Sequence, residues 1–306
     1  MLVALNLMVN MELHFFKWMP QSSATESKKG LTMLLFLHGM GGTGQIWRPI
    51  AASLEEDFLC IAPDQRGHGL SRPIPAAEVN AFHSSDYADD VCSLLSKLVI
   101  EYSPNSIYFI GHSMGVRTAL ATAAKVLSDS TSGVGRELLK GVIAVDIGLQ
   151  SKWGGGIGEP LANFIRALPE TFPGRASLRE YLFANCPDQA IAQYLAAVSK
   201  KIGDSPETWV FPFEHEALVQ TILQADEAPI EQWVRDICAA GVPMLALRGA
   251  DSKVWLKPDY ENSRVTLANP LLTFEEWPGC GHGLPFEQRP KFIERIRAFV
   301  TSTTSQ

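Results

Sequence analysis

The sequence predicts an α/β protein built on a mostly parallel, eight-stranded sheet that carries helices on both faces. Short apolar, β-prone runs alternate along the chain with stretches in which apolar residues recur at helical spacing. The apolar runs are nearly continuous, which is typical of strands buried on both faces of a parallel sheet. The alternation stops over residues 149–240 and then resumes, which predicts a helical insertion between the sixth and seventh strands.

The elements are expected in the following order. The chain opens with an antiparallel hairpin, whose arms are residues 3–8 and 11–18 on either side of a turn at Val9-Asn10. A polar loop over 21–29 follows. The later strands are expected over 33–37, 58–62, 107–110, 142–146, 243–247 and 271–277, and the helices over 46–55, 85–101, 114–128, 258–265 and 286–300.

The insertion divides the chain into three expected parts. Residues 1–148 form the first part of the core, residues 149–240 form a helical cap, and residues 241–306 complete the core. The cap is rich in aromatic residues and contains no clear strand. We expect most of its aromatic side chains to pack together and a minority to line a cleft between cap and sheet.

Composition narrows the functional classes. The net charge is −7, and the Lys and Arg residues form no basic stripe, which argues against a nucleic-acid partner. The five cysteines are odd in number and lack a C-x-x-C pair, which favours free thiols in a reducing compartment. Residues 1–9 lack the basic start of a signal peptide, and no apolar run reaches the length of a membrane span. We expect a cytoplasmic enzyme without stable membrane insertion, metal or cofactor.

A candidate nucleophile follows the strand expected at 107–110. The chain there reads Gly111-His112-Ser113-Met114-Gly115 and leads directly into a helical pattern. A serine between two glycines at a strand-to-helix junction is the sequence signature of a nucleophile elbow. The turn is sharp and strained, and only glycine lets the neighbouring backbone pass close enough. Ser113 is therefore the expected nucleophile of a serine hydrolase.

A glycine-rich loop follows the strand at 33–37 and reads His38-Gly39-Met40-Gly41-Gly42. In a hydrolase, the backbone N–H of Met40 would form one half of an oxyanion hole. The N–H of Met114, directly after the nucleophile, would form the other half.

The same loop also fits a nucleotide-binding interpretation. Gly39, Gly41 and Gly44 match G-x-G-x-x-G, and Asp64 ends a strand twenty residues further on, as a ribose-binding acid would. A nucleotide-dependent oxidoreductase is therefore a distant alternative. It does not explain the serine elbow, and the glycine-rich turn after Asp64 is unlike the helix lead-in of a ribose site.

The remaining catalytic candidates follow later strands. His282 lies on a glycine-rich loop after the last strand, from which it could act as general base for Ser113. Asp251, four positions beyond the strand at 243–247, is the favoured acid to orient His282, since the order Ser, Asp, His suits this architecture. Asp146, at the end of the preceding strand, is the alternative acid.

Together these four segments resemble the α/β-hydrolase superfamily, particularly its capped esterase and C–C hydrolase branch. The resemblance covers nearly the whole chain, including Gly-x-Asp at 249–251 and Gly-x-Gly-His at 279–282. Members with an aspartate nucleophile would carry Asp at position 113, so the serine argues against epoxide hydrolases and haloalkane dehalogenases.

The resulting expectation is a serine-dependent hydrolase of carboxylic esters with a small apolar substrate of short to medium chain length. Ser113, His282 and Asp251 would form the triad, and the reaction would pass through an acyl-enzyme. Hydrolysis of a C–C bond, thioester or lactone on the same residues is the alternative. The fold can also serve as a non-catalytic ligand receptor.

Overall fold

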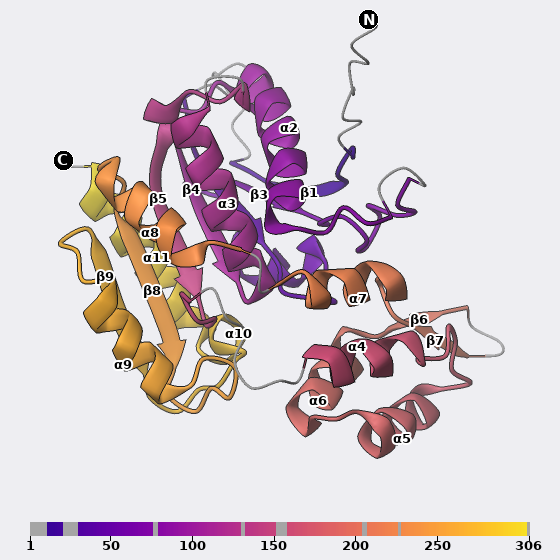
Figure 1. Cartoon of the computed structure of the whole chain (residues 1–306). Coiled ribbons are helices and arrows are strands. Elements are labelled where there is room, and N and C mark those ends of the chain that lie inside the picture. The colour runs from indigo at the N-terminus through magenta and orange to yellow at the C-terminus, as the bar shows by residue number, and fades with distance from the viewer. Residues whose placement is uncertain are drawn as a thin grey trace, which may run out of the picture.

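A twisted seven-stranded sheet forms the centre of the described structure (Figure 1). The computed structural model describes residues 11–20, 30–75, 79–129, 132–150, 158–203, 207–225 and 228–304. The strand order is β1-β3-β2-β4-β5-β8-β9, in which β1 runs antiparallel to β3 and the other pairs are parallel. The strands are β1 (Phe15–Trp18), β2 (Thr32–Leu37), β3 (Leu59–Pro63), β4 (Ser106–His112), β5 (Leu139–Val145), β8 (Met244–Gly249) and β9 (Leu272–Trp277).

The central strands are buried on both faces, as their continuous apolar sequences predict. In β2, Met33 and Leu35 belong to one apolar cluster, whereas Leu34 and Phe36 belong to the cluster on the opposite face. This division follows from the two-residue period of a strand. Both clusters are made of buried side chains, most of them fully removed from water, so the sheet is a rigid base for the loops at its edge.

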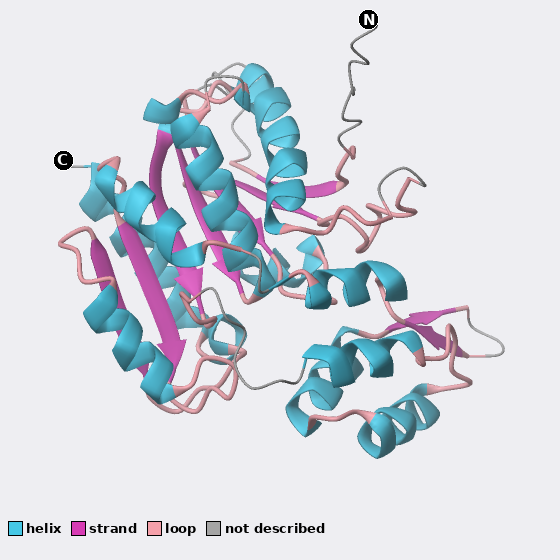
Figure 2. Cartoon of the chain, in the orientation of Figure 1, coloured by secondary structure: helices cyan, strands magenta, loops and turns pink. Residues whose placement is uncertain are grey.

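Helices cover the two faces of the sheet (Figure 2). One face packs against α2, α3, α8 and α9, and the other against α1 and α11. No helix in the described ranges has the length and apolar character needed to cross a membrane. The core helices are α1 (Arg48–Ala51), α2 (Ser84–Tyr102), α3 (Met114–Ser128), α8 (Ile230–Ala239), α9 (Lys257–Thr266), α10 (Leu284–Glu287) and α11 (Arg289–Thr304), with 3₁₀ turns η1 (Gly44–Trp47) and η4 (Arg136–Leu138).

The fold class predicted from the sequence is confirmed, and the element boundaries agree to within a few residues. One expected arm of the opening hairpin, residues 3–8, lies outside the described residues. The other arm forms β1, which pairs with β3 in antiparallel register, Phe15 opposite Pro63 and Trp18 opposite Cys60. The helix expected over 46–55 begins as the 3₁₀ turn η1, because Pro49 enters at the first turn of α1.

Between β5 and β8, the described residues include an insertion of four helices and two short strands that forms a lobe beside the sheet (Figure 1). Its aromatic residues Phe164, Phe172, Phe211 and Phe213 pack in an apolar cluster of their own. Its elements are α4 (Gly158–Arg166), α5 (Arg175–Asn185), α6 (Gln189–Val198), β6 (Lys200–Ile202), β7 (Thr208–Val210) and α7 (His215–Leu223). We refer to these elements together as the insertion.

Two expectations about this segment need correction. The segment does contain strands, because β6 and β7 pair as an antiparallel ribbon. Each is three residues long and β6 is charged and exposed, so no apolar alternation marks it. The other correction concerns the end of the segment at residue 240, since α8 packs against α3 through Val234 and Ile237 in the core cluster. This packing ends the insertion before residue 230.

The insertion is joined to the core at the turn that follows β3. The N–H of Gly69 donates to Pro212 O at 2.7 Å, and the N–H of Glu214 donates to Gly67 O at 2.9 Å. The Glu214 carboxylate also accepts the N–H of Ile74 at 3.0 Å. These bonds hold the start of α7 against the edge of the sheet at which β2, β4 and β5 end.

Candidate active site

Ser113 lies at the sharp turn between β4 and α3, and this turn fixes its conformation. Its backbone has φ 54° and ψ −124°, a strained conformation that separates the strand from the helix. A Cβ at Gly111 would lie 2.4 Å from Gly115 O, and a Cβ at Gly115 would lie 2.2 Å from Leu37 O. Both positions therefore require glycine, as the sequence motif predicts. Ser113 remains partly exposed in an otherwise buried segment.

The loop after β2 lies against this serine. A Cβ built on Gly39 would come within 3.2 Å of Ser113 Cβ. The loop closes on itself through a hydrogen bond from Gly42 N to Gly39 O, 3.0 Å long. Within the described chain, no hydrogen bond uses the N–H of Met40 or that of Met114, the first residue of α3. Both donors are available to an anionic oxygen bound beside Ser113.

Two buried histidines hold this loop in place. His68 Nε2 accepts the N–H of Gly41 at 3.0 Å, while its Nδ1–H donates to Arg66 O at 2.8 Å. His38 Nε2 accepts the N–H of Gln65 at 3.0 Å, and its Nδ1–H donates to Gly39 O at 2.8 Å. Burial lowers the pKa of His38 to about 4 and that of His68 to about 3, so both rings are neutral near pH 7.

His282 is paired with Asp146. Its Nδ1 lies 2.8 Å from Asp146 Oδ2, and its side chain is 27% exposed, whereas that of Asp146 is fully buried. Asp146 directly follows β5 and has φ 53°, which turns it out of the line of the strand. Its carboxylate also accepts the N–H of Gly249 at 2.8 Å and the hydroxyl of Ser252 at 2.5 Å. Donors from the end of β8 with its following loop and from the loop after β9 therefore converge on one carboxylate.

The sequence favoured Asp251 over Asp146 as the partner of His282, but in the structure His282 pairs with Asp146. Asp251 is exposed, and its backbone N–H donates to Cys280 O at 3.0 Å. The side chain of its neighbour Ser252 is buried instead. The chain leaving β8 therefore presents a hydroxyl, not a carboxylate, to the His282 region.

His112 and Glu287, neither of which the sequence indicated as a site residue, anchor the His282 loop. His112 Nε2–H donates to His282 O at 2.8 Å, and the two rings lie 4.7 Å apart. Glu287 accepts the N–H of Gly281 at 2.7 Å and the N–H of Gly283 at 3.1 Å. Burial, followed by the charge of His282, lowers the pKa of His112 to about 3. His112 is therefore a neutral donor that ties the His282 loop to the residue before Ser113, and proximity to the elbow was its only signal in the sequence.

Ser113 and His282 share no direct hydrogen bond within the described residues. Catalytic hydrogen bonds often tighten only when substrate is bound. The bonds from His112 and Asp146 nevertheless fix His282 next to the elbow.

Ser113, Met40 and Met114 line one pocket. Apolar side chains such as Phe82 and Ile147 form part of the wall, and Arg117, one turn beyond Ser113 on α3, brings a cation to it. The insertion contributes Thr221 of α7, and Ala225 lies just after it, whereas the lining does not include the aromatic residues of the insertion that the sequence led us to expect. The remaining lining residues are Ser84, Tyr87 and Thr118.

The nucleotide-binding interpretation of the glycine loop conflicts with the position of Asp64. Its buried carboxylate accepts the N–H of Gly44 at 2.7 Å and the N–H of Leu70 at 2.8 Å. Both oxygens therefore hold loops together instead of facing a ribose. Among the described residues, no group of three or more His, Cys, Asp or Glu side chains could hold a metal ion.

Comparison with known proteins identifies a family. The model described as "Alpha/beta hydrolase family" matches residues 34–296. The 2-(acetamidomethylene)succinate hydrolase of Mesorhizobium japonicum is 34% identical over 115 residues, which span 37% of this chain and 35% of that protein.

Solved structures show the same fold. A crystal structure of E-2-(acetamidomethylene)succinate hydrolase superimposes with a TM-score of 0.68 and 24% identity, covering 89% of this chain and 93% of the other. A marine microorganism esterase superimposes with a TM-score of 0.67 and 21% identity, covering 94% and 99%.

The two buried histidines predict a loss of stability in acid. The unfolded chain takes up protons at these rings as the pH falls below about 6.5, whereas the folded chain does not until the pH approaches 4 to 3. The free energy of unfolding should therefore decrease between pH 6.5 and 4. His68→Gln should reduce that slope by up to about 1.4 kcal/mol per pH unit, because one such ring is removed.

Urea unfolding of both proteins between pH 7.5 and 4 measures this slope. An identical slope in the parent and in His68→Gln would show that His68 takes up its proton equally in both states.

Proposed function

The chain belongs to the alpha/beta hydrolase family, and from that premise we propose that it is a serine hydrolase that cleaves carboxylic esters through an acyl-enzyme. Ser113 is the nucleophile, His282 the general base, and Asp146 the acid that orients His282. The observation that carries the proposal is the combination of a strained Ser113 at the elbow with a His282–Asp146 pair 2.8 Å apart.

The first half-reaction begins when Ser113 Oγ attacks the ester carbonyl carbon. His282 Nε2 takes the hydroxyl proton as the Oγ–C bond forms, while its Nδ1–H remains hydrogen-bonded to the Asp146 carboxylate. The buried carboxylate stabilises the imidazolium that results. The carbonyl oxygen becomes an oxyanion, which accepts the N–H groups of Met40 and Met114. Collapse of this intermediate expels the alcohol, which receives the proton from His282.

The second half-reaction frees the enzyme. Water attacks the acyl-Ser113 carbonyl, gives a proton to His282, and forms a second oxyanion in the same place. Collapse breaks the Oγ–C bond, returns the proton to Ser113 and releases the carboxylic acid. The five cysteines are free and buried, which supports the proposal that this chemistry takes place in a reducing compartment such as the cytoplasm.

The pocket supports two substrate classes. Its apolar wall suits neutral esters of short to medium chain length, because burying their chains removes apolar surface from water. The charge of Arg117, whose NH1 group donates to Ala225 O, favours a second class, esters with a free carboxylate. A relative acts on a substrate named as a succinate, which is consistent with this second class.

Replacement of Ser113 tests the nucleophile. Ser113→Ala should lower kcat by about 10⁴-fold or more, because the covalent route is lost. A fluorophosphonate probe should modify the parent once, on the peptide that contains Ser113. Ser84→Ala removes another pocket serine and should keep both turnover and labelling. Near-normal turnover of Ser113→Ala, or an adduct on another residue, would contradict the proposal.

Paired substitutions test the acid. Asp146→Asn should lower kcat by about 10⁴-fold, because an amide favours the wrong tautomer of His282. Asp251→Asn should remain within about threefold of the parent, since surface changes away from the site are usually close to neutral. Hydrolysis of p-nitrophenyl acetate measures both, and thermal melting checks that each variant folds. The reverse ranking would return the acid to the loop after β8.

A panel of p-nitrophenyl esters tests the substrate class. Among neutral esters, kcat/KM should rise with chain length up to a medium-length acyl group and then fall at the pocket wall. If Arg117 recognises a carboxylate, the hemisuccinate should exceed the butyrate by about tenfold or more in kcat/KM. Arg117→Gln should abolish that preference while retaining the rate on butyrate.

A hemisuccinate preference that survives Arg117→Gln would remove Arg117 from the recognition of charge. Fastest cleavage of long emulsified lipids would contradict both substrate classes. Adding an acyl thioester and a lactone to the panel separates the other bonds that this machinery could cleave.

A further inference from the structure

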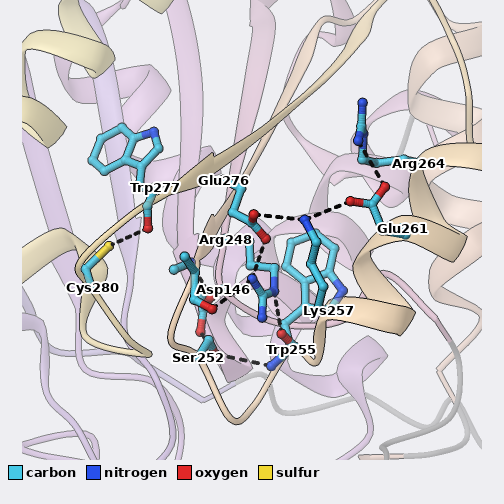
Figure 3. A network of polar contacts seen from close by, with 12 residues as sticks. Asp146, Arg248, Ser252, Trp255, Lys257, Glu261, Arg264, Glu276, Trp277 and Cys280 are labelled. Carbon is cyan, nitrogen blue, oxygen red and sulfur yellow. Dashed lines mark hydrogen bonds and ion pairs between the residues drawn. The ribbon is translucent and has the colours of Figure 1, made fainter.

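The loop that follows β8, residues 250–256, is built around an inward-facing hydroxyl. Ser252 is 3% exposed, in contrast to the exposed Asp251 directly before it. Figure 3 shows Ser252 beside Asp146, at the inner end of a chain of polar contacts that runs outward to Arg264. The sequence drew attention to this loop because of Asp251, yet Ser252 is the residue that reaches the buried carboxylate.

The hydrogen bonds around Ser252 direct its single proton to Asp146. Ser252 Oγ accepts the N–H of Val254 at 3.2 Å and the N–H of Trp255 at 3.3 Å. A hydroxyl has one proton and two acceptor sites, so these two donors occupy its lone pairs. The proton is left for Asp146 Oδ2, which lies 2.5 Å away. That oxygen is the one that accepts His282 Nδ1–H.

The position of Ser252 is held by Arg248, a residue of β8 that is 2% exposed. Its Nε–H donates to Trp255 O at 2.7 Å, and its NH1 group donates to Ala250 O at 3.2 Å. These carbonyls lie on either side of Ser252 in the loop. Because the guanidinium is planar and rigid, binding both carbonyls fixes the loop between them.

The guanidinium is itself fixed by β9 and α9. Arg248 NH1 lies 2.5 Å from Glu276 Oε2, and Lys257 bridges Glu276 and Glu261 at 2.8 Å each (Figure 3). Arg264 pairs with Glu261 at 3.0 Å and is 52% exposed. The outer pairs are in water and contribute little, whereas the Arg248 contacts are buried.

We propose that Ser252 is a positioning residue for Asp146, and that Arg248 holds Ser252 in register through the two loop carbonyls. The inference rests on the proposed function, since it concerns the acid of that reaction. Ser252 and Gly249 N, which bonds Oδ1, hold the carboxylate in the orientation that His282 requires. The end of β8 and the loop after it thus supply hydrogen-bond donors to an acid that directly follows β5.

A double-mutant cycle tests the inference. Ser252→Ala should lower kcat by about 10- to 100-fold, the loss of a hydrogen bond to a charged group, with KM within about threefold. Ser252→Thr retains the hydroxyl and should recover most of kcat. In the Asp146→Asn background, Ser252→Ala should lower kcat by less than about a further threefold, because the carboxylate that Ser252 positions is already gone. Arg248→Lys should likewise lower kcat in the parent and have little further effect on kcat in the Asp146→Asn background.

Arg264→Ala, at the exposed end of the network, is the matched control and should keep the parent kcat. If Ser252→Ala does not fold, Ser252→Cys offers a weaker donor of similar shape, and the same cycle applies. A kcat within about threefold of the parent for the Ala or Cys variant, or losses that multiply in the double variant, would overturn the inference. Failure of Ser113 labelling would instead overturn the proposed function, so the two failures are distinguishable.

Discussion

The buried carboxylate of Asp146 is the interaction on which the arrangement of the site depends. Two parts of the chain far apart in sequence donate to it: the end of β8 with its following loop, through Gly249 N and Ser252 Oγ, and the loop after β9, through His282 Nδ1. A buried carboxylate without such donors would be strongly unfavourable. The folded state therefore requires β5, the loop after β8 and the loop after β9 to meet at one point, and this meeting brings His282 to the elbow.

The elbow and its facing loop are constrained by sterics instead of charge. Gly111 and Gly115 allow β4, α3 and the end of β2 to approach more closely than any side chain would permit. His38 and His68 then fix the loop after β2 by accepting backbone N–H groups. Since both rings must be neutral to accept, the geometry beside Ser113 depends on a dry interior. In the proposed mechanism, rigidity of this kind positions the N–H groups of Met40 and Met114 in advance of the reaction.

The parts of the site that could be predicted from the sequence are those specified locally. Five consecutive residues, 111–115, specify the elbow, and the glycine-rich loop after the last strand identified His282 as the candidate base. The choice between Asp146 and Asp251 could not be made in this way. It depends on the register of β5 against β8, in which Val145 faces Leu247, and on the positive φ of Asp146. Local spacing favoured the residue that turned out to be exposed.

The same limit applies to the fold. The parallel sheet was predictable because nearly continuous apolar runs are buried on both faces, whereas β6 is two lysines and an isoleucine, all exposed, and carries no such signal. The helical cap predicted over 149–240 included the residues of α8, and only the packing of α8 on α3 assigns them to the core.

The most direct test of the account is a crystal structure of the protein after reaction with a fluorophosphonate. The account predicts phosphorus bonded to Ser113 Oγ, with one phosphoryl oxygen within hydrogen-bond distance of both Met40 N and Met114 N. It also predicts that His282 Nδ1 remains on Asp146, with Ser252 on the same carboxylate oxygen. An adduct on another residue, or a His282 that pairs with Asp251 in the adduct, would contradict it.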